Sequence, residues 1–129
     1  MDLIQILKAL ADENRMRILN VLKNGEMCVG EIEHVLDINQ SNASRHLNKL
    51  GTLNLVSYEK KAQWVYYKIN EDMLTEYKFL EELINNELKG IDIYNKDLEK
   101  LSEYRKSGIT CETLKECDIN SKSPCNCKS

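Results

Sequence analysis

The chain has 129 residues, 30% of them charged, and a formal net charge of −3 at neutral pH. This length accommodates one domain of ordinary size. We expect self-association to add to the stability of its core. No apolar run approaches a bilayer span and the N-terminus lacks the pattern of a secretory signal, so we expect a cytoplasmic protein with no membrane partner. Its five cysteines are therefore expected to be reduced thiols, suited to metal, metalloid or redox chemistry rather than to a disulfide framework.

Charge is distributed unevenly along the chain. Residues 39–70 carry five Lys/Arg against one Glu, whereas residues 1–38 carry four against seven acids and residues 71–129 carry nine against thirteen. The net charge excludes a generally basic nucleic-acid binder, but positive charge gathers in the middle of the chain. Because one copy would neutralise few phosphates, useful affinity for DNA would require two copies on one duplex.

The first part of the chain predicts two helices. Apolar residues recur at helical spacing first in Leu3, Ile6, Leu7 and Leu10, and then in Met16, Ile18, Leu19 and Leu22. Asp12 is a suitable N-cap for the second helix, and Asn24–Gly25 is expected to end it.

Two shorter helices separated by a tight turn are predicted next. Residues 31–36 have a short helical pattern that stops at residues 37–39, and residues 39–50 have a longer one without any acidic residue. The apolar stripe of the longer helix consists of Ala43, Leu47 and Leu50. This is the helix-turn-helix arrangement, in which the first helix supports the second and the second reads the major groove of DNA.

The polar surface of the second helix supplies most of the predicted DNA contacts. It consists of Gln40, Ser41, Asn42, Ser44, Arg45, His46 and Lys49. Short hydroxyls and amides at a helix start bond phosphate, and long donors one turn later reach base edges. Both histidines, His34 and His46, are interpreted as surface or DNA-facing residues and not as metal ligands. The same twelve residues are also compatible with an ordinary solvated amphipathic helix.

A β-hairpin is predicted after the helix-turn-helix. Residues 55–59 and 64–69 are rich in strand-forming residues, and Lys60-Lys61-Ala62-Gln63 between them predicts a basic tip. We expect Lys60 and Lys61 to contact phosphate and assign Gln63 to the same DNA-binding surface. The elements together predict a mainly α fold with a β-hairpin wing, a winged helix-turn-helix.

The remainder of the chain has three parts. A long apolar stripe ended by Gly90 predicts a helix over residues 73–88, and residues 91–108 predict one appended helix. Residues 109–129 form a short polar segment with four of the five cysteines, which we expect to be a flexible tail unless a ligand orders it. We thus divide the chain into a DNA-binding and dimerisation domain (1–90), an appended helix (91–108) and a cysteine-rich C-terminal extension (109–129).

The first and last helices of region 1–90 carry more apolar surface than one small domain needs there. We therefore predict a symmetric homodimer. Its expected interface consists of Leu3, Ile6, Leu7, Leu80, Leu83 and Ile84. The alternative is that both helices pack only on their own domain.

Four motifs, in order, resemble those of the ArsR/SmtB family. They are L-K-A-L-A-D-E-N-R-M-R-I-L (7–19), E-M-C-V-G-E-I (26–32), Q-S-N-A-S-R-H-L (40–47) and W-V-Y-Y-K-I (64–69). The resemblance covers roughly residues 1–90. It implies a bacterial, homodimeric winged-helix repressor that leaves its operator when a metal or metalloid ion binds. The second motif is most similar to that of the arsenic-responsive branch, E-L-C-V-C-D-L-C.

The resemblance fails at the family's ion-binding residues. Of the three thiols of the arsenic motif only Cys28 has a counterpart, because Gly30 and Glu33 occupy the other two places. The family's zinc site, an Asp and His set on the last dimer helix, is also incomplete: Asp72 is present, but no histidine lies beyond residue 46. At the wing tip, Ala62 stands where the family usually has glycine.

The thiols of the C-terminal segment are the strongest candidates for an ion site. Arsenite and antimonite are thiophilic, and three thiolates satisfy them. Cys125 and Cys127 flank a single residue, so their sulfurs can converge when the backbone bends, and Cys117 or Cys111 would supply the third ligand. Cys28 is a weaker candidate, because a lone cysteine between Met and Val is more often a small buried apolar residue. A cysteine-rich terminus without function is the alternative for the tail.

The leading functional prediction is a DNA-binding transcriptional repressor that binds double-stranded operator DNA, has no permanently bound cofactor, and releases the DNA on capturing As(III) or Sb(III). Alternatives are the same repressor with a thiol redox switch or a response to Zn(II) or Cd(II). A contrasting class is a thiol-rich carrier of metalloid that uses the winged helix only for dimerisation. Nothing in the sequence arranges a nucleophile, a base and an orienting group, so we predict no enzyme.

Overall fold

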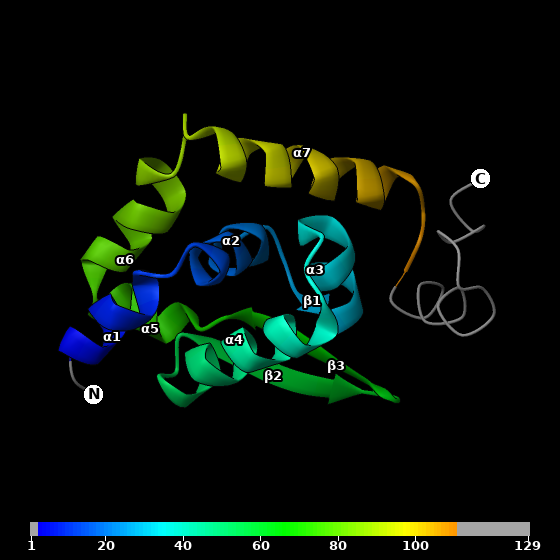
Figure 1. The fold of residues 1–129 in the computed structure, drawn as a ribbon. Helices are drawn as coiled ribbons and strands as arrows, with labels where there is room; N and C mark the ends of the chain where they lie inside the picture. The colour runs from blue at the N-terminus through cyan, green and yellow to red at the C-terminus, as the bar shows by residue number, and fades with distance from the viewer. Residues whose placement is uncertain (1–2, 111–129) are drawn as a thin grey trace.

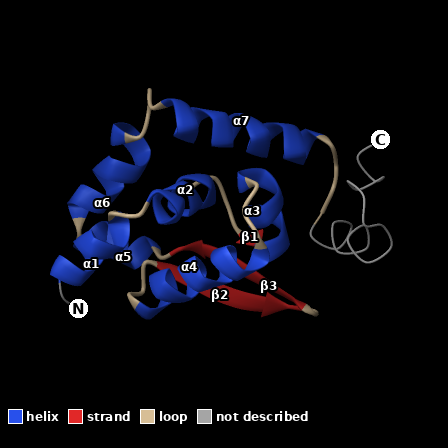
Figure 2. Cartoon of the chain, viewed as in Figure 1, coloured by secondary structure: helices blue, strands red, loops and turns tan. Residues whose placement is uncertain are grey.

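The structure is a computed structural model, and it describes residues 3–110. The four cysteines predicted as ion ligands in the tail, Cys111, Cys117, Cys125 and Cys127, lie outside the described residues. The elements are α1 (Leu3–Leu10), α2 (Glu13–Leu22), β1 (Met27–Cys28), α3 (Val29–Leu36), α4 (Gln40–Thr52), β2 (Val56–Lys61), β3 (Trp64–Ile69), α5 (Glu71–Glu76), α6 (Lys78–Glu82), the π-helical turn η1 (Leu83–Glu87) and α7 (Asp92–Lys106). Figure 2 shows helices gathered around one small sheet.

The helices of the DNA-reading part begin and end where local chemistry predicts. The Asp12 carboxylate accepts a hydrogen bond from the Arg15 backbone N–H (3.1 Å) and caps α2, and the Asn39 side chain accepts from the Asn42 N–H (2.9 Å) and caps α4. Between α3 and α4, Asp37 adopts a left-handed backbone with φ 56° and turns the chain. The predicted helix-turn-helix is confirmed.

The sheet has three antiparallel strands in the order β1-β3-β2. The predicted hairpin of β2 and β3 is confirmed, but its tip is shorter than expected. Lys61 pairs with Trp64, so both lysines lie within β2 and only Ala62 and Gln63 form the turn. Ala62 has a left-handed φ of 56°, the conformation for which glycine is usually selected. The strand β1 was not predicted, because two residues are too few to show an alternating pattern.

The core lies between three layers. Figure 1 shows α2 and α3 in the middle, α7 across one side of them, and α4 with the sheet on the other side. The largest completely buried side chains come mainly from the middle layer and α4, and include Ile18, Leu19, Ile32, Leu36, Leu47 and Leu50. Among residues 3–110, no helix is long and apolar enough to cross a membrane.

Residues 73–88 do not form one continuous helix, so that prediction is wrong. The chain leaves the helix at Tyr77, which is extended (φ −117°, ψ 91°), and resumes as α6 and η1. Met73 and Leu80, on either side of the break, are both buried in the core. The sequence hides the break because the apolar spacing stays helical across it.

The helix predicted over residues 91–108 is confirmed as α7, with Gly108 after it at φ 78°. It is not peripheral to the domain. Leu101, Tyr104 and the following Ile109 are buried in the same core cluster as the residues of α2, α3 and α4. The first 90 residues therefore share their core with α7 and with Ile109, the first residue of the predicted cysteine-rich extension.

Candidate nucleic-acid interface

Helix α4 presents one buried and one exposed face. Its apolar residues Ala43, Leu47 and Leu50 are completely buried, and they fix the helix against α2, α3 and β2. Most predicted DNA-contacting side chains lie on the opposite side. Gln40, Ser41, Arg45 and Lys49 are exposed, and Asn42 and Ser44 are half-buried. The structure therefore brings six of the seven predicted helix residues to one accessible polar surface.

The amino end of this surface suits an anion. The first turn of α4 contains no acidic residue, and the exposed Gln40 and Ser41 flank backbone N–H groups at the positive end of the helix dipole. One turn later, the Arg45 guanidinium donates to the Asn42 side-chain oxygen at 3.0 Å. Because this single neutral partner uses only part of the guanidinium fork, Arg45 keeps donors for a guanine edge or a phosphate.

The prediction that His46 faces solvent or DNA is wrong. Its side chain is only 3% exposed, because it lies beside the apolar stripe of α4 and turns toward the start of α2. Its Nε2 is 3.9 Å from the Asp12 carboxylate, and no described residue bonds its Nδ1. Burial lowers the pKa of His46 and outweighs the nearby Asp12 carboxylate, so the neutral imidazole is favoured.

The two wing lysines differ in their surroundings. Lys61 forms an ion pair with Glu26 at 2.6 Å and lies 5.6 Å from the centre of the Tyr66 ring. The bond to Glu26 raises the pKa of Lys61. Lys60 points to the other face of the strand and is exposed, as is Gln63 at the tip. Of the two lysines predicted at the wing tip, Lys60 is therefore accessible without an acidic partner among the described residues, whereas Lys61 already neutralises Glu26.

Two residues were missed at the level of the sequence, one on the wing and one on the far side of the molecule. Tyr58, on the same face of β2 as Lys60, is 69% exposed and contacts the ring of Tyr67 at 5.8 Å between centroids. The alternation of side chains along the strand predicts the face on which Tyr58 lies. How exposed its side chain is depends on how far the hairpin extends from the rest of the domain. Asp97 of α7, which was not singled out from the sequence, is completely buried and bonded to Arg17 of α2.

The described residues contain little of the predicted ion chemistry. Cys28 is buried at the start of α3, as expected for a small core residue, but it is disulfide-bonded, so for this residue the prediction of a reduced thiol is wrong. Its backbone N–H donates to the Glu31 carboxylate at 3.0 Å. Within residues 3–110, no group of three or more His, Cys, Asp or Glu side chains is arranged to hold a metal ion. His34 is half-buried against Tyr104, with ring centroids 5.4 Å apart.

An apolar surface lies where α1 meets α6. Leu3, Ile4, Leu7 and Phe79 are each more than a third exposed, and Leu7, Phe79 and Leu83 line a shallow groove of about 440 Å³. Of the predicted dimer residues, Leu3, Leu7 and Leu83 belong to this surface. Ile6, Leu80 and Ile84 do not, because they are completely buried in the protomer's own core, and for them the prediction is wrong.

Comparison with known proteins supports the DNA-reading assignment. The family model described as "Bacterial regulatory protein, arsR family" matches residues 12–58, which include α2, α3 and α4. The arsenic resistance transcriptional regulator ArsR1 of Pseudomonas putida is 30% identical over 115 residues, covering 82% of this chain and 84% of that protein. The cadmium resistance transcriptional regulatory protein CadC homolog of Staphylococcus aureus is 34% identical over 86 residues, 64% of this chain and 71% of that protein.

A solved structure agrees with the fold. The homodimeric winged helix-turn-helix DNA-binding domain of a possible ArsR-family transcriptional regulator from Mycobacterium bovis superposes with a TM-score of 0.56 and 29% identity. The match covers 67% of this chain and 81% of that domain. A third of the present chain therefore has no counterpart in it.

Proposed function

Because this chain belongs to the ArsR family of bacterial regulatory proteins, we propose that it is a homodimeric repressor that leaves its operator when a thiophilic ion binds its cysteines. It is a DNA-binding transcriptional regulator and not an enzyme. The observation that carries the proposal is the exposed, acid-free surface of α4, presented by a helix whose other face is completely buried.

In this proposal each α4 enters one major groove. Arg45 reads base edges, while the amino end of α4 and Lys60 of the wing hold phosphates. A dimer reads two half-sites about 34 Å apart, one turn of DNA. The second copy supplies the affinity that one small basic surface lacks.

The apolar surface of α1 and α6 is the proposed dimer interface. Leu3, Ile4, Leu7 and Phe79 are contiguous with a groove that an identical surface on a second copy would fill. Leu7→Glu places a charge in this surface without disturbing the protomer core. Sedimentation at micromolar concentration should then give a monomer, and a variant that stays dimeric would place the interface elsewhere.

For the effector we propose As(III) or Sb(III), held by Cys125 and Cys127 with Cys117 or Cys111 as third ligand. Support comes from thiol chemistry, since three thiolates satisfy these ions, and from the arsenic resistance regulator 30% identical to this chain. Cd(II) is the second candidate, because a cadmium resistance regulator is 34% identical and cadmium is also thiophilic. The reduced protein carries no permanent cofactor in either case.

A mobility-shift assay on the DNA upstream of the protein's own gene tests these proposals. Reduced full-length protein is expected to bind this DNA and to release it with arsenite or antimonite, and the same titration with cadmium, zinc and peroxide ranks the alternatives. A chain that binds arsenite but never binds the upstream DNA would be a carrier and not a repressor.

The ligands are tested in the same assay with two matched variants. Full-length Cys125→Ser/Cys127→Ser should bind operator normally and keep it in the presence of arsenite. The control Cys28→Ala should still release the operator. If the double variant released DNA like the wild type, the effector site would have to lie elsewhere.

A further inference from the structure

Helix α3, the supporting helix of the DNA-reading pair, is bonded to α7 at its amino end. The Glu31 carboxylate makes two hydrogen bonds there: one oxygen accepts from the Cys28 backbone N–H at 3.0 Å, and the other accepts from the Tyr104 hydroxyl of α7 at 2.7 Å. Burial and the bond to Glu31 raise the pKa of Tyr104, so its hydroxyl stays protonated and donates. We call this contact the Tyr104 latch.

The carboxyl end of α3 is bonded to α7 through α2. The carbonyl of Leu36, the last residue of α3, accepts from the Arg17 guanidinium at 2.9 Å. Asp97 of α7 holds the same guanidinium with two bonds, at 2.8 and 3.0 Å, and its side chain is 2% exposed. The turn to α4 begins at the next residue. This second contact, the Asp97 latch, therefore connects α7 to the start of that turn.

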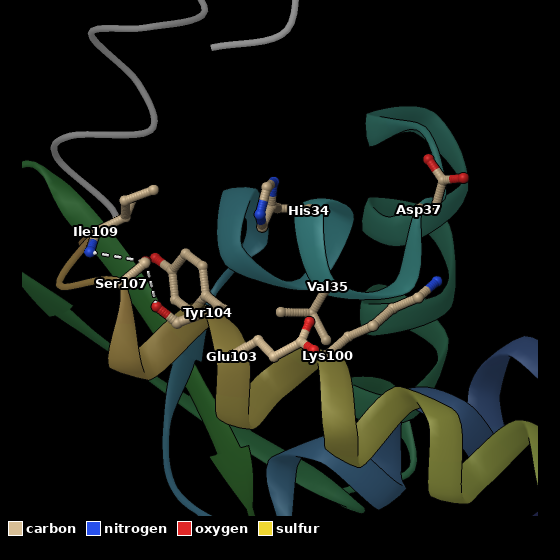
Figure 3. A pocket seen from close by; sticks show the side chains of 8 residues that line it. All are labelled: His34, Val35, Asp37, Lys100, Glu103, Tyr104, Ser107 and Ile109. Atoms are coloured by element: carbon tan, nitrogen blue, oxygen red, sulfur yellow. Dashed lines mark hydrogen bonds between the residues drawn. The ribbon is translucent and has the colours of Figure 1, made fainter. Parts of the chain in front are cut away.

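Between the latches the two helices are separated by a hollow. Figure 3 shows His34 and Val35 of α3 facing Lys100, Glu103 and Tyr104 of α7 across a pocket of about 540 Å³. The hollow lies on the outer sides of the two helices, whereas their inner sides pack together: Val35 and Tyr104 belong to the same buried core cluster. The polar latches add fixed contacts to this packing at both ends of α3.

We propose that α7 is a positioning helix for DNA recognition, and that Tyr104 and Asp97 are its positioning residues. The inference rests on the proposed repressor function, and it concerns residues outside the region 12–58 that the family model matches. A three-residue turn joins α3 to α4, so the orientation of α3 fixes that of the recognition helix. In a dimer, a small rotation at each copy changes the separation of the two recognition helices and hence their fit to half-sites one turn apart.

The test uses three full-length variants. Tyr104→Phe removes one hydroxyl, Asp97→Asn removes the charge of the second latch, and Glu99→Gln is the control, an exposed acid on the same helix. Amide hydrogen exchange reports how firmly α3 and the turn are held. Titrations against operator and against unrelated DNA of equal length separate recognition from general attraction to phosphate. Tyr104→Phe keeps the proposal testable if Asp97→Asn does not fold.

Tyr104→Phe is expected to exchange faster in residues 29–39 than the control, while α1 and α6 stay as in the wild type. Its affinity for operator should fall by about 5-fold or more, a typical size for coupling between sites, with affinity for unrelated DNA unchanged. Operator affinity equal to that of Glu99→Gln would overturn the proposal, even with faster exchange, because α7 would then stabilise α3 without orienting it. A wild type that does not bind its upstream DNA would count against the repressor function instead, and the exchange of residues 29–39 would still decide whether α7 holds α3.

Discussion

The outer face of α4 and the seam between α2 and α7 use similar side chains for opposite purposes. Arg45 on α4 is exposed and donates to one neutral oxygen, that of Asn42. Arg17 in the seam is largely enclosed and donates to both oxygens of Asp97 and to a main-chain carbonyl. The bond to Asp97 also raises the pKa of Arg17. An arginine with most of its donors occupied stabilises the fold, whereas one with donors left over is available to a ligand.

The largest effect is expected from removing Asp97, the buried acid that binds Arg17. Asp97→Ala leaves the Arg17 guanidinium without its partner, and we expect it to lower the free energy of unfolding by about 3–5 kcal/mol. Urea unfolding followed by circular dichroism measures it. A loss below about 1 kcal/mol would mean that water or another acid replaces Asp97 at little cost.

The converse substitution on the outer face is Arg45→Ala. We expect operator affinity to fall by about 1–3 kcal/mol, the range for one bidentate arginine contact to a guanine. The free energy of unfolding should change by less than about 0.5 kcal/mol, since the side chain is exposed. Fluorescence anisotropy with operator and with unrelated DNA measures the first, and the pair of DNAs shows whether the loss is sequence-specific.

His46 sharpens the comparison, because it is a polar residue of α4 that belongs to the interior. Its pKa is lowered from 6.5, first by burial and then by Arg45 and Arg15, with Asp12 acting in the opposite direction. The fold therefore favours the neutral imidazole. The stability that this residue contributes is fully present above pH 6.5 and is lost as the pH falls through the lowered pKa.

Unfolding experiments from about pH 7.5 to about pH 5 test this linkage. The wild type should lose more stability over that range than His46→Gln, and the difference between the two isolates the histidine from the acids that titrate nearby. Parallel curves for the two proteins would show that His46 titrates in the fold as it does in the unfolded chain.

The smallest expected effect is a difference between Lys60 and Lys61 in the salt dependence of DNA binding. Lys60→Gln should reduce the slope of log affinity against log salt by about 0.9 for each phosphate that the protein no longer neutralises. Replacing the ion pair as Lys61→Gln/Glu26→Gln removes no net charge and should change the slope less. Equal changes would mean that DNA displaces Glu26 from Lys61 and that both lysines bind phosphate.

What the sequence predicted correctly is what neighbouring residues determine. Asp12 marks a helix start through a bond to the residue three positions later, and the hairpin follows from two neighbouring β-rich runs. The latches could not be predicted in this way, because Arg17 and Asp97 are 80 positions apart and only the packing of α7 brings them together.

Two buried polar residues did leave a signal in the spacing. His46 falls between Ala43 and Leu50 at the three- and four-residue steps of the buried stripe, and Asp97 does the same between Tyr94 and Leu101. Polar side chains such as these are usually exposed to solvent, but their position within the apolar stripe indicated that they are buried. A polar residue within an apolar stripe is therefore a candidate for a buried hydrogen bond or ion pair.

In the proposed DNA complex, the left-handed alanine at the wing tip would affect the entropy of binding. Holding Ala62 at φ 56° costs the folded chain about 1–2 kcal/mol relative to a residue without a Cβ atom. A glycine would relieve that cost, but its backbone would sample many more conformations in the free protein and would lose them when the wing meets the duplex. With alanine, part of that ordering takes place during folding, before any DNA is bound. In the proposed complex the tip would thus reach the duplex with fewer conformations left to lose, at the expense of some stability in the hairpin.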